Sequence, residues 1–249
     1  MYNKVKTDAE IQAIRESGRQ LAVVLQKIEE VVKPGLTGLE IDNLSREELK
    51  KMGGIPAFLG YQGFQHSICI SINDAVVHGI PNNIPFKSGD VVGFDFGVIY
   101  AGMITDAART FIIGDTTSEK SKLVQSTLRS LDNAINVVKN GCSVGDIASS
   151  VQNVLDKANL GIVRDLVGHG VGHHVHEDPE IPNYGVAGTG SKLKSGMTIA
   201  IEPMSTMGDY KVVIDPDGWT IRTRDGSLSA HFEDTILITD SGSEILTRL

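Results

Sequence analysis

Two stretches of the chain repeat one pattern, in which a Lys-Ser-Gly turn leads into an apolar segment that carries an acid near its end. They read KSGDVVGFD at residues 87–95 and KSGMTIAIE at residues 194–202. Taking a lone carboxylate out of water is costly, so an acid within an apolar strand needs a metal, an arginine or a proton beside it. The matched positions of Asp95 and Glu202 therefore predict one shared site.

The repeat extends upstream of these turns. Seven residues, Val31, Val32, Lys33, Gly35, Thr37, Glu40 and Ile41, have counterparts 106 positions later in Val137, Val138, Lys139, Gly141, Ser143, Asp146 and Ile147. Each half is therefore predicted to contain a helix, a glycine stop, and a second helix opened by a capping box of Thr or Ser with an acid three residues later. The Lys-Ser-Gly turns follow at an offset of 107. We expect a duplicated single catalytic domain over 1–249, with halves of approximately 1–115 and 116–249.

Hydrophobic spacing predicts the main elements. The first helix is expected to begin at the capping box formed by Thr7 and Glu10 and to reach Val32, with 118–138 as its counterpart in the second half. β-branched and aromatic residues predict strands at 67–72, 91–98, 108–113, 198–201, 220–224 and 229–239. Because no long polar linker separates the halves, they are expected to share one sheet system covered by helices, an α/β (α+β) fold.

Bulk properties narrow the class of protein. The net charge of −8 argues against non-specific nucleic-acid binding, which requires a surface rich in Lys and Arg. No apolar run approaches the roughly 20 residues that span a bilayer, and the first residues lack a signal-peptide pattern. Cys69 and Cys142 are too few for a thiolate cluster and are expected to be reduced and packed as small apolar groups. We expect a cytoplasmic protein, monomeric, with no membrane and no specific nucleic-acid partner.

Four acids occupy comparable settings. Asp106 follows Asp95 by eleven residues across a turn centred on Gly102, so a hairpin would place both acids on neighbouring strands. In the second half, Glu202 and Glu233 each adjoin an apolar segment. Each acid alone is equally compatible with a structural salt bridge, but four crowded carboxylates repel one another unless positive charge is present. Two divalent cations would supply that charge.

Histidines cluster in the segment GHGVGHHVHEDP, which holds four of the seven in the chain. His169 lies between two glycines and is free to approach a buried centre closely. A zincin helix is rejected, because no HExxH glutamate follows and glycines oppose a helix. His173 and His174 are expected to be surface or packing residues, and His78, taken alone, is more typical of a hydrogen-bonded core histidine. The sequence contains no GxSxG elbow, P-loop or dinucleotide fingerprint.

The ordered set Asp95, Asp106, His169, Glu202 and Glu233 resembles that of type I, bacterial-type methionine aminopeptidases. The segments SIN…HGIP, GHGVG…HEDPEIPNYG, IEPM and DGWT…RDGSLSAHFEDTI carry the same resemblance over essentially the whole chain. It implies the pita-bread fold, with pseudo-two-fold halves and a central antiparallel-rich sheet covered by helices. It also implies removal of the first methionine from deformylated nascent peptides whose second residue is small, with transient ribosome association.

The resemblance also implies residue roles. Two divalent ions (Co, Mn, Fe(II) or Zn) would be held by Asp95 on one ion, His169 and Glu202 on the other, and Asp106 and Glu233 between both. Glu202 would carry a proton from the attacking water to the leaving amine. His176 would stabilise the developing oxyanion, and His78 would hold the substrate backbone. The methionine pocket would include Tyr61, Cys69 and Trp219.

Five positions depart from the family pattern as the resemblance presents it. Phe58 and Phe64 stand where a small residue and a tyrosine are usual, Val175 replaces an aromatic residue, and Gly97 replaces a threonine. His231 stands in place of a glutamine, two residues before Glu233, and is expected to reach the metal site from the same strand face. Two alternatives stay open: a prolidase-like or creatinase-like hydrolase of the same fold, and a metal-free binding module.

Overall fold

The computed structural model describes residues 4–249. Four α-helices lie in pairs, α1 (Asp8–Val31) with α2 (Gly38–Met52) and α3 (Ser118–Asn136) with α4 (Val144–Lys157), and a 3-10 turn, η1, spans Tyr61–Gly63. The strands are β1 (Ile55–Pro56), β2 (Ile68–Ile72), β3 (Ala75–Val77), β4 (Val91–Tyr100), β5 (Met103–Ile112), β6 (Gly161–Ile162), β7 (Gly168–Gly170), β8 (Glu177–Ile181), β9 (Thr198–Ile201), β10 (Met204–Thr206), β11 (Val212–Ile214), β12 (Ile221–Thr223), β13 (Ser229–His231), β14 (Asp234–Ile238) and β15 (Ser243–Ile245). Within these residues, no helix is both long and apolar enough to cross a membrane.

Capping boxes open the second helix of each half, as the repeat predicts. At the start of α2, Glu40 accepts hydrogen bonds from the backbone and hydroxyl of Thr37, each at 2.8 Å. At the start of α4, Asp146 accepts the same two bonds from Ser143, again at 2.8 Å. These bonds satisfy donors that a helix start leaves without partners, which is why both helices begin where they do. The prediction of a capping box before α1 is also confirmed.

A long hairpin forms the centre of the first half. β4 pairs antiparallel with β5 over ten residues and with β2 on its other side. Ala101 and Gly102 make the two-residue turn, with φ of 47° and 81°, the left-handed values that such tight hairpins require. The predicted strand at 108–113 therefore begins too late, because β5 starts directly after this turn. Asp95 lies mid-strand in β4, since β4 continues to Tyr100.

The second half contains a five-stranded sheet in the order β15-β14-β9-β7-β8. Its β9 occupies the position of β4 in the repeat, and Glu202 directly follows β9. The predicted strand 229–239 is divided into β13, which pairs with β10, and β14, which pairs with β9. The break at residues 232–233 allows the two pieces to join different sheets.

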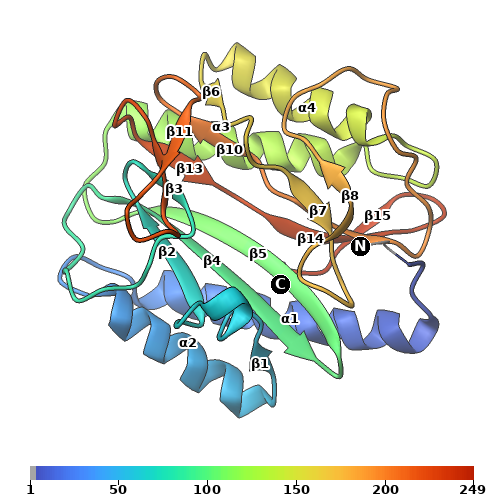
Figure 1. Ribbon diagram of the computed structural model, residues 1–249, viewed down its shortest axis with the longest axis horizontal. Coiled ribbons are helices and arrows are strands. Elements are labelled where there is room, and N and C mark those ends of the chain that lie inside the picture. The colour runs from blue at the N-terminus through green and yellow to red at the C-terminus, as the bar shows by residue number, and fades with distance from the viewer. Residues whose placement is uncertain (1–3) are drawn as a thin grey trace.

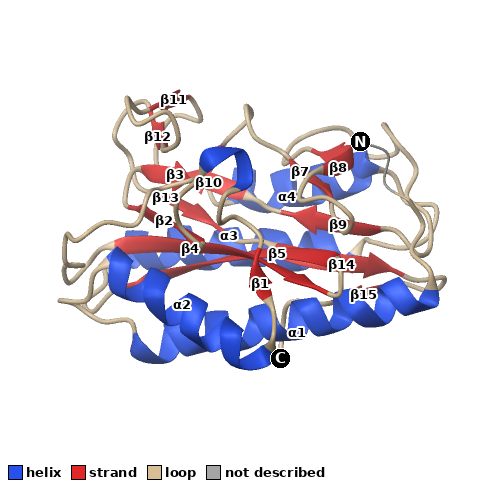
Figure 2. Cartoon of the chain, turned by 60° about the horizontal axis from the view of Figure 1, so that its bottom comes forward, coloured by secondary structure: helices blue, strands red, loops and turns tan. Residues whose placement is uncertain are grey.

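The helix pairs lie on opposite sides of the molecule (Figure 1). One core cluster packs Leu21 of α1 and Ile41 of α2 against Phe94 of β4, and another packs Ile147 of α4 against Ile199 of β9. Figure 2 shows α1 and α2 on one side of the strands. Residues 4–249 form four hydrogen-bonded sheets rather than the expected single system. An isolated antiparallel bridge between Ala108 and Glu233 links the main sheets of the two halves.

Candidate metal centre and active site

The predicted site residues gather around one pocket between the two halves. All ten of them line it: Tyr61, Cys69, His78, Asp95, Asp106, His169, His176, Glu202, Trp219 and Glu233. In the sequence they extend from Tyr61, in the 3-10 turn η1, to Glu233, directly before β14. The fold therefore brings together residues that the sequence could only group by chemistry.

Asp95 and Asp106 project from the central hairpin. In its register Asp95 lies opposite Ala108, while Asp106 lies opposite Gly97. The two acids are thus diagonal neighbours on one face of the sheet, within reach of each other. The backbone N–H of Asp106 donates to the hydroxyl of Thr235 at 2.9 Å, and that hydroxyl donates to the Asp106 carbonyl at 2.8 Å. A residue of β14 thereby fixes an acid of β5.

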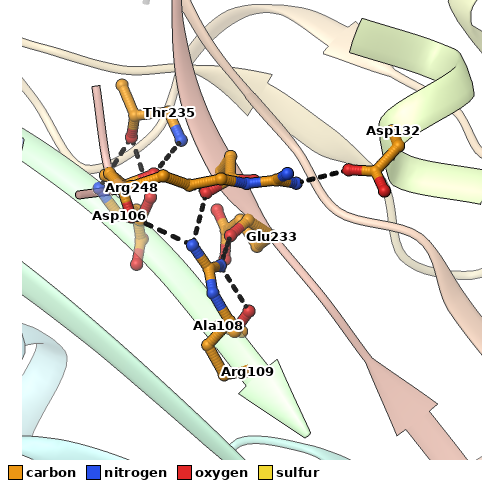
Figure 3. Close-up of polar contacts among 9 residues, drawn as sticks. Asp106, Ala108, Arg109, Asp132, Glu233, Thr235 and Arg248 are labelled. Atoms are coloured by element: carbon orange, nitrogen blue, oxygen red, sulfur yellow. Dashed lines mark hydrogen bonds and ion pairs between the residues drawn. The ribbon is translucent and has the colours of Figure 1, made fainter. Parts of the chain in front are cut away.

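Glu233 is placed by backbone contacts across the junction of the halves. Its N–H donates to the Ala108 carbonyl at 3.0 Å and its carbonyl accepts from the Ala108 N–H at 3.2 Å. Arg109 reinforces this bridge, because its Nη1 donates to the Glu233 carbonyl at 2.6 Å (Figure 3). The other guanidinium nitrogen of Arg109 lies 2.7 Å from Asp234 Oδ1. Glu233 can therefore project its carboxylate inward while its backbone is held on both sides.

His169 sits at the centre of β7. A side chain on Gly168 would lie 2.4 Å from the Ala200 carbonyl oxygen, so glycine is what lets β7 pack this close to β9. His169 Nδ1 is 2.9 Å from the Gly170 carbonyl, which accepts its proton and leaves Nε2 unprotonated and able to bind a metal. That Nε2 lies 3.5 Å from Glu202 Oε1.

Glu202 follows β9 at the point where the chain leaves the sheet. Its backbone carbonyl accepts a 3.0 Å hydrogen bond from the side chain of Asn183, which is almost fully buried. Asn183 belongs to the segment that the sequence reads as PNYG, and sequence reasoning assigned it no role. Its contact explains how an acid outside a regular strand is held in a fixed position.

The four carboxyl groups of this cluster have raised pKa values. Burial raises the pKa of Asp95, Glu202 and Glu233 well above the usual range, with a further rise from neighbouring carboxylates. Burial also raises the pKa of Asp106 to about 7. Within residues 4–249, Asp95 Oδ1, Asp106 Oδ1 and Glu233 Oε1 are buried without a hydrogen-bond partner. Buried oxygens of this kind in one cluster are a donor set suited to divalent cations.

The imidazoles around the acids are held neutral. Burial, with a smaller contribution from nearby His176, lowers the pKa of His169 to about 3 and that of His78 to about 4. Burial likewise lowers the pKa of His176. Neutral imidazole is the form that ligates metals or donates one hydrogen bond while accepting another.

His176 has a defined orientation. Its Nδ1 lies 3.1 Å from the Tyr61 hydroxyl, and its ring centroid lies 4.4 Å from that of His169. A proton donated by Tyr61 to Nδ1 places the imidazole proton on Nε2, free for a ligand. His78 has a backbone φ of 58°, a left-handed conformation that is uncommon for a side-chain-bearing residue and concentrates at functional sites.

The apolar wall of the pocket contains most of the positions that depart from the family pattern. Phe58, Phe64 and Val175 belong to one buried cluster with Cys69, against which Trp219 packs. The rings of Phe64 and Trp219 have centroids 5.0 Å apart. Sequence reasoning missed further lining residues, namely Gln62, Val77, Leu166 and Val167, which carry no motif that sets them apart.

Two expectations about the other histidines can be compared with the structure. His173 contacts acids away from the pocket, with its Nε2 2.7 Å from Glu10, and His174 is exposed. His231, at the end of β13, points its Nε2 to 3.5 Å from Glu202 Oε2 and 3.8 Å from Glu233 Oε2. It therefore reaches the acid cluster as expected, although the two residues do not share a strand, because β13 ends at His231 and Glu233 lies in the break before β14.

Comparisons with known proteins agree with this arrangement. The model of metallopeptidase family M24 matches residues 12–240. A methionine aminopeptidase of Clostridium acetobutylicum is 44% identical over 244 residues, which cover 98% of each protein. The chain belongs to the methionine aminopeptidases of family M24. A family relative from Escherichia coli is 40% identical over 249 residues, with 99% of this chain and 94% of that protein covered.

Solved structures place the fold in the same group. The methionine aminopeptidase of Thermotoga maritima matches with a TM-score of 0.97 and 45% identity, covering 99% of this chain and all of that one. A prolidase from Pyrococcus furiosus matches with a TM-score of 0.75 and 23% identity, covering 98% of this chain and 65% of that one. The prolidase likeness concerns the fold alone. The predicted pita-bread architecture is thus confirmed, and the methionine aminopeptidases are the nearer group.

Proposed function

We propose that this chain, as a single catalytic domain of two repeated halves, is a metal-dependent aminopeptidase that removes an N-terminal methionine when the second residue is small. The observation that carries the proposal is the position of the acid cluster at one side of a pocket whose other wall is apolar and aromatic. Such a pocket can bury a thioether side chain while the first peptide bond lies against the acids.

The fit of divalent ions rests on the donor set. Asp95, Asp106, His169, Glu202 and Glu233 would hold them, because three of these acids have buried oxygens with no partner in residues 4–249 and His169 directs an unprotonated Nε2 inward. Two ions such as Co, Mn, Fe(II) or Zn would offset the mutual repulsion of the carboxylates. Ions bound there would lower the pKa of water and polarise the scissile carbonyl.

Glu202 is the residue suited to proton transfer. Without metal, burial and Asp106 raise the pKa of its carboxyl. As a carboxylate that lines the pocket, Glu202 can take a proton from the attacking water and return it to the leaving amine. His176 can donate its Nε2 proton to the carbonyl oxygen as negative charge develops there. His78, which also lines the pocket, can contact the substrate backbone beside the scissile bond.

Specificity for methionine follows from the apolar wall. Phe58, Phe64 and Trp219 surround the pocket with aromatic carbon, and Cys69 contributes a neutral thiol because burial raises its pKa well above the usual value. A flexible thioether gains dispersion contacts with such groups, whereas a charged side chain would lose its hydration without compensation.

The direct test compares Met-Ala-Ser, Met-Lys-Ser and X-Pro dipeptides as substrates of protein stripped of metal and then reconstituted. We expect methionine release from Met-Ala-Ser, little release from Met-Lys-Ser, and no activity before metal is returned. Cleavage of X-Pro dipeptides without methionine release would instead favour the prolidase-like alternative. If no peptide is hydrolysed either before or after metal is returned, the result would favour a metal-free binding module.

The cellular setting is part of the proposal. Substrates would be deformylated nascent chains in the cytoplasm, with the protein acting as a monomer in transient contact with the ribosome. Cosedimentation with translating ribosomes tests the contact, and light scattering tests the oligomeric state. Absence of the protein from the ribosome fraction after crosslinking would refute the ribosome contact without bearing on the proposed hydrolysis.

A further inference from the structure

His231 has a buried ring nitrogen that the roles above leave unused. Its side chain is about 3% exposed, and among the described residues its Nε2 is buried with no hydrogen-bond partner. Burial, together with His78 and Arg109, lowers the pKa of His231 to about 3, so the ring is neutral. A buried, unpartnered imidazole nitrogen is costly unless something occupies the space before it.

The backbone of His231 is held firmly. It pairs with Met204 between β13 and β10. The hydroxyl of Thr110, on β5, donates to the His231 carbonyl at 2.6 Å and accepts from the His231 N–H at 3.1 Å. A strand pair and a side chain from the opposite half thus aim this ring at the acid cluster.

The position of His231 matches that of His169 across Glu202. His169 Nε2 lies 3.5 Å from Glu202 Oε1, and His231 Nε2 lies 3.5 Å from Glu202 Oε2. Two nitrogen or oxygen ligands of one ion, each bound at about 2.1 Å, are separated by roughly 3 to 3.5 Å. Each oxygen of Glu202 therefore faces an imidazole at close to a ligand-to-ligand distance.

Two groups of ligand atoms in the structure lie close enough to hold an ion. One is formed by Asp106, His169 and Glu233, and the other by Glu202, His231 and Glu233, with the ligand atoms of each group within 4.8 Å of one another. Glu233 belongs to both. Each group contains one imidazole, whereas the five-residue set inferred from the family resemblance contains only that of His169.

We propose that His231 is an additional protein ligand of the metal centre, binding through Nε2 a divalent ion that it shares with Glu202 and Glu233. This inference rests on the proposed function and extends it by giving the centre two imidazoles. A second imidazole shifts preference away from Mg and Mn and toward Fe(II), Co and Zn, which take nitrogen ligands readily. A glutamine at this position would offer only an amide.

The test counts imidazole ligands directly. Metal-free protein is loaded with Co(II), and X-ray absorption measures the imidazoles bound per two ions, while calorimetry measures Co(II) affinity. We expect two bound imidazoles in the native protein and one in His231→Gln. The Co(II) affinity of one ion site should fall more than about 10-fold, because loss of a residue that only hydrogen-bonds to a metal ligand already costs at least that much. His169→Gln should also leave one imidazole.

His174→Gln is the matched control, since this histidine is exposed, and it should keep both imidazoles and the native affinity. A native count of one overturns the inference, whether or not His231→Gln folds. An unchanged count in a folded His231→Gln, with slower turnover, would instead make His231 a positioning residue for Glu202. Failure to bind Co(II) or to release methionine from Met-Ala-Ser would refute the proposed function itself, so the two failures are distinguishable.

Discussion

Lys6 Nζ lies 3.1 Å from Glu177 Oε2, and both side chains are excluded from solvent. The other oxygen of Glu177 accepts hydrogen bonds from the backbone N–H groups of His173 and His174, at 2.7 and 3.1 Å. Glu177 directly follows His176, so this ion pair ties the segment before α1 to the loop that presents the proposed oxyanion donor.

Breaking this pair should be expensive. Lys6→Met leaves a buried carboxylate without its ammonium, and we expect the free energy of unfolding to fall by about 3 to 5 kcal/mol in urea titrations. Lys27→Met removes the lysine of an exposed pair with Glu30 and should change it by less than about 1 kcal/mol. Equal effects of the two substitutions would show that the buried pair does not anchor the loop.

Glu202→Gln should separate chemistry from folding. The amide cannot carry a proton between water and amine, so kcat should fall by about 10²- to 10⁴-fold. The fold should be retained, since the backbone contact from Asn183 does not involve the carboxylate. Peptide assays and circular dichroism measure the two properties. Glu180→Gln, at an exposed position on β8, is the control, and a native kcat in Glu202→Gln would refute the assigned role.

Tyr61→Phe tests the orientation of His176. Loss of the hydroxyl removes the 3.1 Å contact to Nδ1 while the ring stays on the pocket wall. One hydrogen bond contributes about 1 kcal/mol, so kcat should fall up to about 10-fold with KM nearly unchanged. Tyr184→Phe, outside the pocket, should be neutral. A rise in KM at constant kcat would assign Tyr61 to substrate contact alone.

Gly97 and Phe58 form a size-matched pair. A Cβ on Gly97 would lie 2.8 Å from the Phe58 ring and 2.9 Å from Ala57 Cβ, so Gly97→Ala should destabilise the protein by about 1 to 3 kcal/mol. Gly93, on the same strand, has its nearest neighbour at 3.6 Å, and Gly93→Ala should be tolerated. In thermal unfolding, Phe58→Ala combined with Gly97→Ala should be less harmful than the sum of both. Strict additivity would contradict the pairing.

Metal-free protein should lose stability as pH rises above 6.5. Burial raises the pKa of Asp106 to about 7, and it raises the pKa of Asp95, Glu202 and Glu233 well above the usual range, so the folded state holds protons that the unfolded state releases. Below pH 6.5 the lowered pKa values of the histidines act in the opposite direction, since unfolded imidazole is then protonated. Above pH 6.5 only the acids contribute, and the free energy of unfolding should fall by about 1.4 kcal/mol per pH unit for each proton that the folded state retains.

Thermal melts at pH 7 and 8, with and without Co(II), measure this effect. Bound cations favour the ionised carboxylates, so the metal-loaded protein should show little loss or a gain over the same interval. A metal-free protein whose melting temperature rises from pH 7 to 8 would show that the acids are already ionised without metal.

Sequence patterns predicted the parts of this molecule that depend on local chemistry. The capping boxes at Thr37 and Ser143 identified helix starts, and the strand at 198–201 was located correctly because its apolar run is bounded by turns. The strand at 229–239 was not divided, because its hydrophobic alternation gives no sign that residues 232–233 leave one sheet for another.

The site was predicted as a set of residues but not as a geometry. Four acids beside apolar strands indicated a common centre, since carboxylates crowded together are costly to bury unless positive charge is shared among them. The contact between Tyr61 and His176, the Asn183 support of Glu202 and the fit of Phe58 over Gly97 join residues distant in sequence. Such contacts depend on tertiary packing, which leaves no local pattern to read.

The bridge between Ala108 and Glu233 also sets when the protein can act. Glu233 comes last in chain order among the proposed ligands, and its place depends on pairing with a strand made much earlier. A chain whose residue 233 has not yet left the ribosome therefore lacks Glu233 from its proposed metal centre. We therefore expect the enzyme to be inactive during its own synthesis, until its second half has docked on its first, although its substrates are other nascent chains.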